Sequence, residues 1–240
     1  METKKTCINC GGSLEPRFSF CPDCGQTTKV KRLTLRYWFK ILRKKVIDID
    51  SDFLRLLLDL IRRPGYAIKE YLSGKRKQYY EPFKFLTFML ALSVFVNEYF
   101  HILEKIPGGK TVASDFASRH YNLLIMINVP LMAFYTWLLF RRRGYNFAEM
   151  LAAQAFLGGF RTLFFVLILS PLFYFQPEHT VMALLVYVFA WMGYVIWAHI
   201  QLLGRPIFST VAKTILAVLL TQFTITIGLS LLVLQEKWHQ

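Results

Sequence analysis

Residues 62–86 read RRPGYAIKEYLSGKRKQYYEPFKFL, and this stretch divides the chain into two unlike parts. A polar, basic segment with all four cysteines precedes it, and long apolar runs follow it. Within it, Lys75, Arg76 and Lys77 come just before two tyrosines and the first apolar run. Cations, then aromatic rings, then hydrocarbon is the order expected at a membrane interface. The stretch is therefore interpreted either as a basic linker or as a collar in which Lys75, Arg76 and Lys77 bind anionic headgroups.

The composition of the chain fits a membrane protein better than a soluble one. Its 240 residues are 55% hydrophobic, yet its formal net charge is +14. The two properties separate along the sequence, because most of the cations lie before residue 80 and the apolar runs lie after it. A strongly basic chain can bind nucleic acid, but here the positive charge adjoins apolar runs of membrane length. We therefore expect anionic membrane lipid as a partner, and no nucleic acid.

Four cysteines form two matching motifs in residues 1–28. Cys7 and Cys10 bracket Ile-Asn, Cys21 and Cys24 bracket Pro-Asp, and a glycine follows each pair. Each motif places two thiolates on one tight turn, and two such turns supply the four sulfurs of a closed tetrahedral Zn²⁺ site. A module this small has almost no core, so we expect the metal to be structural and to supply the folding energy. Iron, two disulfides, free thiols and a redox pair are the alternatives.

Residues 29–81 are predicted to form a basic, amphipathic and interfacial helical segment. Wound as a helix, residues 33–49 have one basic and one apolar face, which fits a helix lying on a membrane or packed on the protein. A second helix over residues 52–63 is too short to cross a membrane, which takes about 20 residues, so it is interfacial or docked on the bundle. Pro64 is expected to start a third short helix that Gly74 closes.

Long apolar runs dominate residues 82–240. Each is near or above the ~20 residues that a membrane-spanning helix needs. The runs lack the two-residue alternation of barrel strands, so helices are the way to satisfy their backbone groups in lipid. The sequence thus predicts an all-α membrane protein, with about five transmembrane helices preceded by interfacial amphipathic helices and a small N-terminal zinc ribbon. The expected spans are residues 83–100, 122–140, 151–175, 180–203 and 211–234.

The cations between the runs predict the orientation of the chain in the membrane. The N-terminal arm and the loop at residues 141–143 are rich in Lys and Arg, whereas the loop at residues 176–179 carries neither. The loop at residues 101–121 carries Lys and Arg as well and is a mild exception. By the positive-inside rule the N-terminus is expected to be cytoplasmic and, with five spans, the C-terminus outside.

Several segments together resemble a bacterial membrane family catalogued as domain-of-unknown-function family 3667. They are CINCGG and CPDCGQ around the cysteines, DFLRLLLDLIRRPGYAIKEYLSGKRKQYYEPFKFL from residue 52, and YNFAEMLAAQAF from residue 145. The likeness covers most of the chain and is strongest over residues 1–90. The resemblance implies a zinc ribbon joined to a multi-pass domain in the inner membrane of a bacterium. It brings no activity and no catalytic residues to this sequence.

Few residues of the sequence suggest catalysis. No nucleotide-binding loop, nucleophile elbow or metalloprotease motif occurs. His101, Glu104, Asp115 and His120 share one loop, but their spacing is not diagnostic, so the loop is interpreted as solvated. No catalytic residue is therefore predicted.

Arg161 is the most informative polar residue in the apolar runs. It lies near the middle of an expected span, where a lone Arg costs ~2.5–3.5 kcal/mol, so it must face the bundle, a water cavity or a lipid headgroup. A guanidinium suits a phosphate or a carboxylate. One hypothesis is that Arg161 binds an anionic group of a lipid or solute in a cavity partly lined by Gln154 and Gln222. The alternative is that carbonyls and hydroxyls of the last span satisfy Arg161 structurally.

Three classes of function are compatible with these features of the sequence. The leading interpretation is a non-enzymatic scaffold in the inner membrane, whose cytoplasmic zinc ribbon binds a protein partner. The second is a transporter-like protein that handles an anionic or lipidic solute through a polar cavity near Arg161. The third and least favoured is an intramembrane enzyme acting on lipid-linked substrates, because no two glutamates share a span at helical spacing.

Overall fold

The computed structural model describes residues 5–30, 32–35, 51–100 and 121–238. The expected helix over residues 33–49 lies largely outside these residues, and the loop with His101, Glu104, Asp115 and His120 lies wholly outside them. The strands are β1 (Lys5–Thr6) and β2 (Ser13–Leu14), which pair antiparallel. The helices are α2 (Ser51–Arg62), α3 (Pro64–Ser73), α4 (Pro82–Phe100), α6 (Tyr121–Leu139), η2 (Arg141–Arg143), α7 (Phe147–Phe164), η3 (Phe165–Leu169), α8 (Ser170–Phe175), η4 (Pro177–His179), α9 (Thr180–Leu203) and α10 (Ile207–Trp238).

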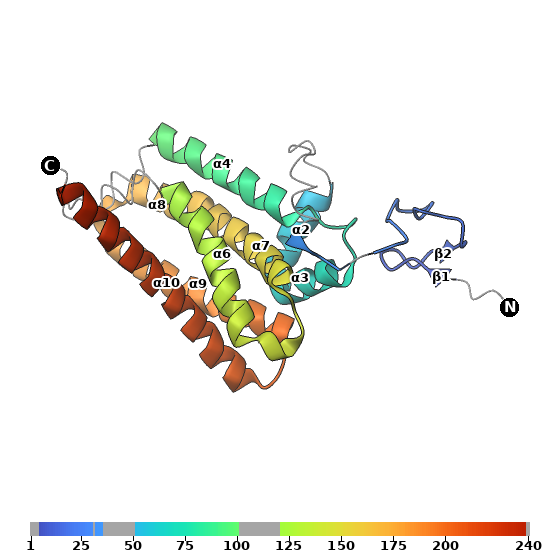
Figure 1. Cartoon of the computed structure of the whole chain (residues 1–240). Coiled ribbons are helices and arrows are strands. Elements are labelled where there is room, and N and C mark those ends of the chain that lie inside the picture. Colours follow the sequence, from blue (N-terminus) through green and yellow to red (C-terminus); the bar gives the residue numbers. More distant parts are fainter. Residues whose placement is uncertain (1–4, 31, 36–50, 101–120, 239–240) are drawn as a thin grey trace.

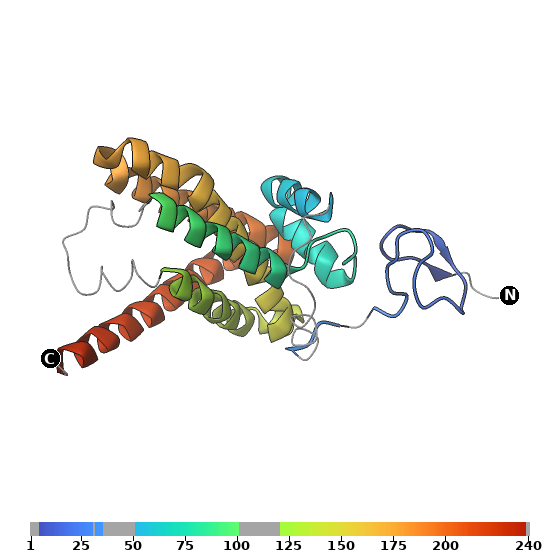
Figure 2. The same cartoon turned by 90° about the horizontal axis from the view of Figure 1, so that it is seen from above.

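Five long helices form the main body of the molecule. Figure 1 shows α4, α6, α7, α9 and α10 side by side, with α2 and α3 packed across one end of them. The cysteine-bearing ribbon lies beyond α2 and α3, at the opposite side from the C-terminus (Figure 2). Helix α7 is central, because α4, α6 and α3 all contact it. Along the chain, the ribbon comes first, then α2 and α3, and then the bundle of long helices.

Among the residues that the structure describes, three helical segments are long and apolar enough to cross a membrane: Phe147–Phe175, Thr180–Leu203 and Ile207–Leu231. A shorter apolar helix covers Leu123–Leu139. The prediction of a helical, multi-pass membrane protein is thereby supported, but the predicted count of five spans is not confirmed. The first expected span forms helix α4, in which Lys84, Asn97 and Glu98 shorten the apolar stretch.

The stretch around Pro64 folds as predicted. Pro64 occupies the first turn of α3, where its missing N–H is not needed, and Arg63 is the N-cap residue. Gly74 ends α3 with φ of 117°, in the left-handed region that glycine adopts at little cost. The N–H of Lys75 then donates to the Glu70 carbonyl oxygen at 3.1 Å, which completes the turn.

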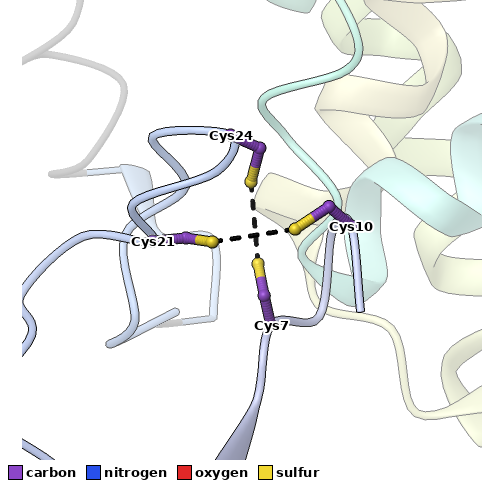
Figure 3. A group of neighbouring side chains, drawn as sticks. All are labelled: Cys7, Cys10, Cys21 and Cys24. Atoms are coloured by element: carbon purple, nitrogen blue, oxygen red, sulfur yellow. Dashed lines mark hydrogen bonds between the residues drawn. The ribbon is translucent and has the colours of Figure 1, made fainter. Parts of the chain in front are cut away.

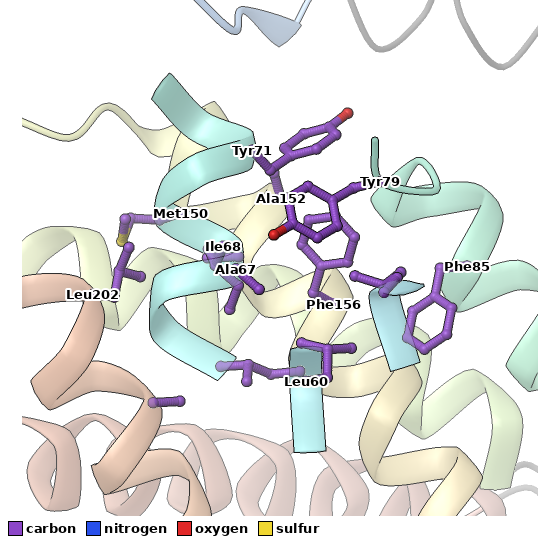
Figure 4. Close-up of a cluster of buried hydrophobic side chains, with 14 of the residues drawn as sticks. Leu60, Ala67, Ile68, Tyr71, Tyr79, Phe85, Met150, Ala152, Phe156 and Leu202 are labelled. Atoms are coloured by element: carbon purple, nitrogen blue, oxygen red, sulfur yellow. The ribbon is translucent and has the colours of Figure 1, made fainter. Parts of the chain in front are cut away.

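Helices α2 and α3 are docked on the bundle, which was one of the two alternatives for residues 52–63. Figure 4 shows the buried cluster that joins them to α7 and α9. The ring of Tyr71 meets that of Phe156 edge to face, with centroids 5.1 Å apart. The Tyr194 hydroxyl donates to the Leu60 carbonyl oxygen at 2.9 Å. At Gly65, an added Cβ would lie 2.1 Å from the Ala198 carbonyl oxygen, so α3 and α9 approach as closely as backbones can.

Helix α2 presents apolar side chains on two faces. Phe53, Leu56 and Leu60 are buried against the bundle. Leu54, Leu58 and Ile61 are more than half exposed, and their spacing of four and three residues places them on one stripe. An exposed apolar stripe on a docked helix fits contact with lipid at a membrane interface.

Residues 32 and 33 fasten the chain after the ribbon to the start of α7. The Arg32 guanidinium donates to both carboxylate oxygens of Glu149, at 2.7 and 2.8 Å, and also to the Gly144 carbonyl oxygen. Asn146 caps α7 by accepting from the Glu149 N–H at 2.9 Å, and Glu149 accepts in return from the Asn146 N–H at 2.8 Å. The Asn146 amide also donates to the Leu33 carbonyl oxygen at 3.1 Å. The capping box therefore also anchors the segment that leads from the ribbon.

Candidate metal centre and polar cavity

The two cysteine motifs adopt the same backbone turn. The Gly11 N–H donates to the Cys7 carbonyl oxygen at 2.8 Å, and the Gly25 N–H donates to the Cys21 carbonyl oxygen at 2.9 Å. Both glycines have positive φ, of 81° and 70°, so a glycine after each pair is a requirement of the turn. The two cysteine motifs therefore fold into the same turn because their local sequences share the same pattern.

The two turns bring the four cysteine sulfurs together, as Figure 3 shows. The Sγ atoms of Cys7 and Cys24 lie 3.7 Å apart, and those of Cys10 and Cys21 lie 3.6 Å apart. All four lie within 4.8 Å of one another. All four are free cysteines, with sulfurs much farther apart than the ~2.05 Å of a disulfide bond, so the structure favours a metal site over two disulfides. Four convergent thiol groups can bind a metal ion.

The predicted collar residues lie in the loop between α3 and α4, beside the ribbon. The backbone N–H of Lys77 donates to Gln26 Oε1 at 3.1 Å, and Gln26 is buried in the ribbon. Lys75 Nζ lies 3.9 Å from Glu70 Oε2. Lys75 and Arg76 are half-buried, whereas Lys77 is exposed. The three collar residues therefore form a group distinct from Arg161.

A cluster of charged groups around Arg63 joins α2, α3 and the collar loop. Arg63 donates to both oxygens of Asp59, at 2.9 and 3.0 Å, and to Glu70 Oε1 at 3.1 Å. The Tyr79 hydroxyl lies 2.8 Å from Asp59 Oδ2 and 2.9 Å from Glu70 Oε2, so its single proton serves two carboxylates. Burial, hydrogen bonds to both carboxylates and their charges raise the pKa of Tyr79. Burial works to raise the pKa of Asp59, but hydrogen bonds from Arg63 and Tyr79 outweigh it and lower that pKa.

A cavity of about 130 Å³ lies between α6, α7, α9 and α10. Its volume is well above the ~10–15 Å³ that one water needs. Arg161, Gln154 and Gln222, which were predicted from the sequence to share a cavity, all line it. The other lining residues are Asn128, Val129, Met132, Leu157, Gly158, Tyr187, Val188, Trp191, Met192, Val195, Val218 and Thr221. Among these lining residues there is one cation and no carboxylate, which favours an anion over a cation.

Helix α9 holds the Arg161 side chain in place. Arg161 Nε donates to the Tyr187 hydroxyl at 3.0 Å. The guanidinium carbon lies 5.8 Å from the centre of the Trp191 ring and 5.9 Å from that of Tyr187, which is within the range of cation–π attraction. Tyr187 and Trp191 were not predicted, because each reads as an ordinary apolar residue of its span. Their spacing of four residues, one helical turn, is the only signal the sequence carries.

Gln154 joins the cavity to a buried polar network that was not predicted from the sequence. Gln154 Nε2 lies 3.1 Å from His199 Nε2 and 3.4 Å from Thr136 Oγ1. His199 Nδ1 lies 3.0 Å from Thr214 Oγ1. All four side chains are buried, and they come from α6, α7, α9 and α10. The network links the four helices that surround the cavity.

The central segment of the chain, which carries the collar, is similar to a known family. Residues 50–94 match the family described as protein of unknown function (DUF3667). The resemblance inferred from the sequence is thereby confirmed over α2, α3, the collar and most of α4. The matched range includes the whole Arg63 cluster but neither the four cysteines nor Arg161. Neither a curated protein nor a solved structure matches the chain.

Proposed function

We propose that this chain is a multi-pass protein of the bacterial inner membrane that binds an anionic group of a lipid or solute in the cavity beside Arg161. The observation that carries the proposal is the cavity itself, which is lined by Arg161, two glutamines and an asparagine between four helices. A guanidinium next to neutral amides suits a phosphate or carboxylate group, because all of them can donate hydrogen bonds to it. The proposed role is therefore to handle such a ligand, as a transporter or lipid-binding protein.

A cavity-filling variant tests this role. Val218→Phe adds volume at the cavity wall, whereas Val181→Phe adds the same group to a side chain that is 57% exposed on α9. Wild type and Val181→Phe should gain thermal stability in detergent when phosphatidylglycerol or phosphatidic acid is added, and Val218→Phe should gain much less. An equal gain for all three proteins would place the lipid effect outside the cavity and refute the proposal.

The metal that the ribbon holds is proposed to be a structural Zn²⁺. A tetrahedral site with Zn–S bonds of about 2.3 Å requires sulfur–sulfur distances of about 3.8 Å. The observed distances of 3.6 and 3.7 Å support that geometry. With four thiolates, all coordination positions are taken, which supports a structural role. Because a site of four thiolates binds one ion, elemental analysis of protein purified without chelator should find about one zinc per chain. Another metal, or no metal, would overturn this assignment.

We propose that the ribbon lies on the cytoplasmic side of the membrane and the C-terminus on the outer side. The cations of the collar and the short helix Arg141–Arg143 support this, because both lie at the ribbon end of the bundle. Alkaline phosphatase fused at residue 240 should be active and the same enzyme fused after Arg143 inactive. Activity after Arg143 and none at residue 240 would refute the orientation. Two inactive fusions would place the C-terminus on the cytoplasmic side with the ribbon, which would refute an odd number of spans.

A scaffold role is the second candidate, and the surface of the ribbon favours it. Ile8 and Phe20 are 48% and 64% exposed, although the ribbon is small and polar. Exposed apolar side chains on a rigid metal-bound module fit docking of a protein partner. A photo-crosslinking residue placed at Phe20 should give one discrete protein adduct in cells, which Ile8→Ser should abolish. No adduct, or one that Ile8→Ser leaves unchanged, would reject the scaffold role.

A further inference from the structure

The hydrogen bonds of Gln154 determine which part of its side chain is left for a ligand. A glutamine amide has two N–H donors and one carbonyl acceptor. Its nitrogen lies 3.1 Å from His199 Nε2 and 3.4 Å from Thr136 Oγ1, so both donors are directed into the buried network. The remaining polar atom is the carbonyl oxygen Oε1, on a side chain that lines the cavity.

His199 fixes this orientation through its tautomer. Because His199 Nε2 accepts from Gln154, the ring proton is on Nδ1, which donates to Thr214 Oγ1 at 3.0 Å. His199 is fully buried and does not line the cavity. It therefore acts as a positioning residue that holds Gln154 with its oxygen available to the cavity.

The opposite wall supplies donors. Asn128 Nδ2 donates to Gln222 Oε1 at 3.4 Å, so the Gln222 amide nitrogen is directed away from Asn128. Arg161 adds its positive charge at the same cavity. A ligand in the cavity thus meets a cation and a carbonyl acceptor, two turns apart on α7, and the Gln222 amide donors of α10.

We propose that the cavity selects oxyanions that carry a hydroxyl group, namely hydrogen phosphate or the protonated monoanion of a phosphate monoester, over sulfate and phosphodiesters. This inference rests on the anion-binding function proposed above. The anionic oxygens of the ligand face Arg161 and Gln222, and its P–OH group donates to Gln154 Oε1. Sulfate has no proton to donate at neutral pH, so it would leave the carbonyl oxygen unpaired, and an unpaired buried acceptor is costly.

The same chemistry can come from free phosphate or from the headgroup of a lipid such as phosphatidic acid. Trp191 lines both the polar cavity and an apolar groove of about 470 Å³ bounded by α2, α7, η3 and α9. The groove is lined by Ile61, Phe160, Leu163, Phe164, Leu167, Ile168, Ala190, Trp191 and Tyr194. An acyl chain could occupy it while the phosphate occupies the cavity, so both sources need testing.

Equilibrium binding of labelled inorganic phosphate to the full chain in detergent tests the proposal. Unlabelled phosphate should displace the label at a concentration about tenfold or more below that of sulfate, as expected for one unpaired buried acceptor. This comparison needs only the wild-type protein, so it does not depend on any variant folding. Equal displacement by the two anions overturns the proposed selectivity but leaves the anion-binding function intact. No saturable binding of either anion, together with no effect of lipid, overturns both.

Two matched substitutions test whether Gln154 is the residue that selects phosphate over sulfate. Gln154→Met removes the acceptor and should abolish the preference for phosphate over sulfate while some binding of both is retained. Gln222→Met removes donors from the same cavity and should weaken both anions by a similar factor, which leaves the ratio unchanged. A preference that survives in Gln154→Met would overturn the role of the carbonyl oxygen.

Lipid source and pH distinguish the two ligands. If the ligand is a lipid, phosphatidic acid should stabilise the protein more than phosphatidylglycerol, because only the monoester has a P–OH group. That advantage should shrink as pH rises above the second pKa of the monoester, which is about 6. Inorganic phosphate keeps a hydroxyl at pH 8 and should bind throughout. An advantage of phosphatidylglycerol over phosphatidic acid at pH 6 would overturn the proposal for lipids.

Discussion

The ribbon and the Arg161 cavity are both polar centres, but the chain builds them in opposite ways. All four cysteines of the ribbon lie within residues 7–24, on two turns that repeat the same backbone hydrogen bonds. The cavity draws its residues from α6, α7, α9 and α10, between positions 128 and 222. One centre is a product of local sequence, and the other exists only after the bundle has packed.

The two centres also differ in the room that they leave. The four sulfurs of the ribbon lie within 4.8 Å of one another, so a bound ion would fill the space between them. The cavity holds about 130 Å³, and its polar groups are spread over its walls. The first centre suits permanent structure, whereas the second suits a ligand that enters and leaves.

Removing the metal should have the largest effect, and it should be confined to the ribbon. The double change Cys21→Ser and Cys24→Ser should abolish metal binding and unfold the ribbon, because such sites contribute on the order of 10 kcal/mol to folding. Limited proteolysis should then cut within residues 5–30, while the bundle remains intact. Retained metal stoichiometry in the double variant would contradict the four-cysteine centre, and melting of the bundle would contradict its independence.

The next largest effect is expected where α3 crosses α9. Gly65→Ala puts a methyl group 2.1 Å from the Ala198 carbonyl oxygen, so the helices must separate, at about 1–3 kcal/mol. The matched control is Gly193→Ala in α9, where no atom lies within 4 Å of the added Cβ. Thermal unfolding in detergent should show a lower Tm for Gly65→Ala only. Equal Tm values for the two variants would contradict the docking of α2 and α3 on the bundle.

Structural features that are determined by a short stretch of sequence could be predicted from the sequence alone. The cysteine spacing predicted the cluster of four sulfurs, Pro64 and Gly74 predicted the limits of α3, and the apolar runs predicted the long helices with small errors at their ends. The length of the last helix differs most: α10 runs from Ile207 to Trp238, whereas residues 211–234 were expected. A run of apolar residues marks the lipid-crossing part of a helix, and the helix continues past it into polar residues.

Side-chain contacts between residues far apart in the sequence could not be predicted. Arg161, Gln154 and Gln222 were grouped because each is polar in an apolar run, which a sequence shows directly. Their partners Tyr187 and His199 are not conspicuous in this way, since an aromatic residue or a lone histidine is common in a core. The Arg63 cluster was missed for a related reason, because its charges read as ordinary surface residues of two short helices. Asp59 lies one helical turn before Arg63, but only the packing of α3 and the loop after it against α2 brings Glu70 and Tyr79 to the same guanidinium.

Arg63 and Arg161 provide a sharper contrast, because two carboxylates surround Arg63 while an open cavity borders Arg161. Arg63→Met should remove the cation that Asp59 and Glu70 share, and should destabilise the protein by about 1–2 kcal/mol, since the partly exposed side chain is screened by solvent. Arg62→Met, at an exposed neighbouring position, should have little effect. A difference between the two Tm values of less than about a degree would contradict a structural role for the Arg63 cluster.

The Arg63 cluster should also make stability depend on pH at both extremes. The pKa of Asp59 is lowered, so its contribution is present above its ordinary value of about 3.9 and is lost as pH falls through the folded value. The pKa of Tyr79 is raised, so its contribution is present below about 10 and is lost as pH rises above that value. Asp59→Asn should reduce the loss of unfolding free energy at acid pH, and Tyr79→Phe should reduce the loss at alkaline pH. If neither variant changes these losses, other groups control the pH dependence.

The most direct test of the central claim compares wild type and Arg161→Gln for stabilisation by an anionic lipid. The variant keeps a polar side chain at the position, so it should fold, and its Tm without lipid should stay close to that of wild type. Added phosphatidic acid should raise the Tm of wild type by several degrees and that of Arg161→Gln by little or nothing. Equal protection of the two proteins by the lipid would contradict a ligand site at Arg161 and leave the residue with a structural role only.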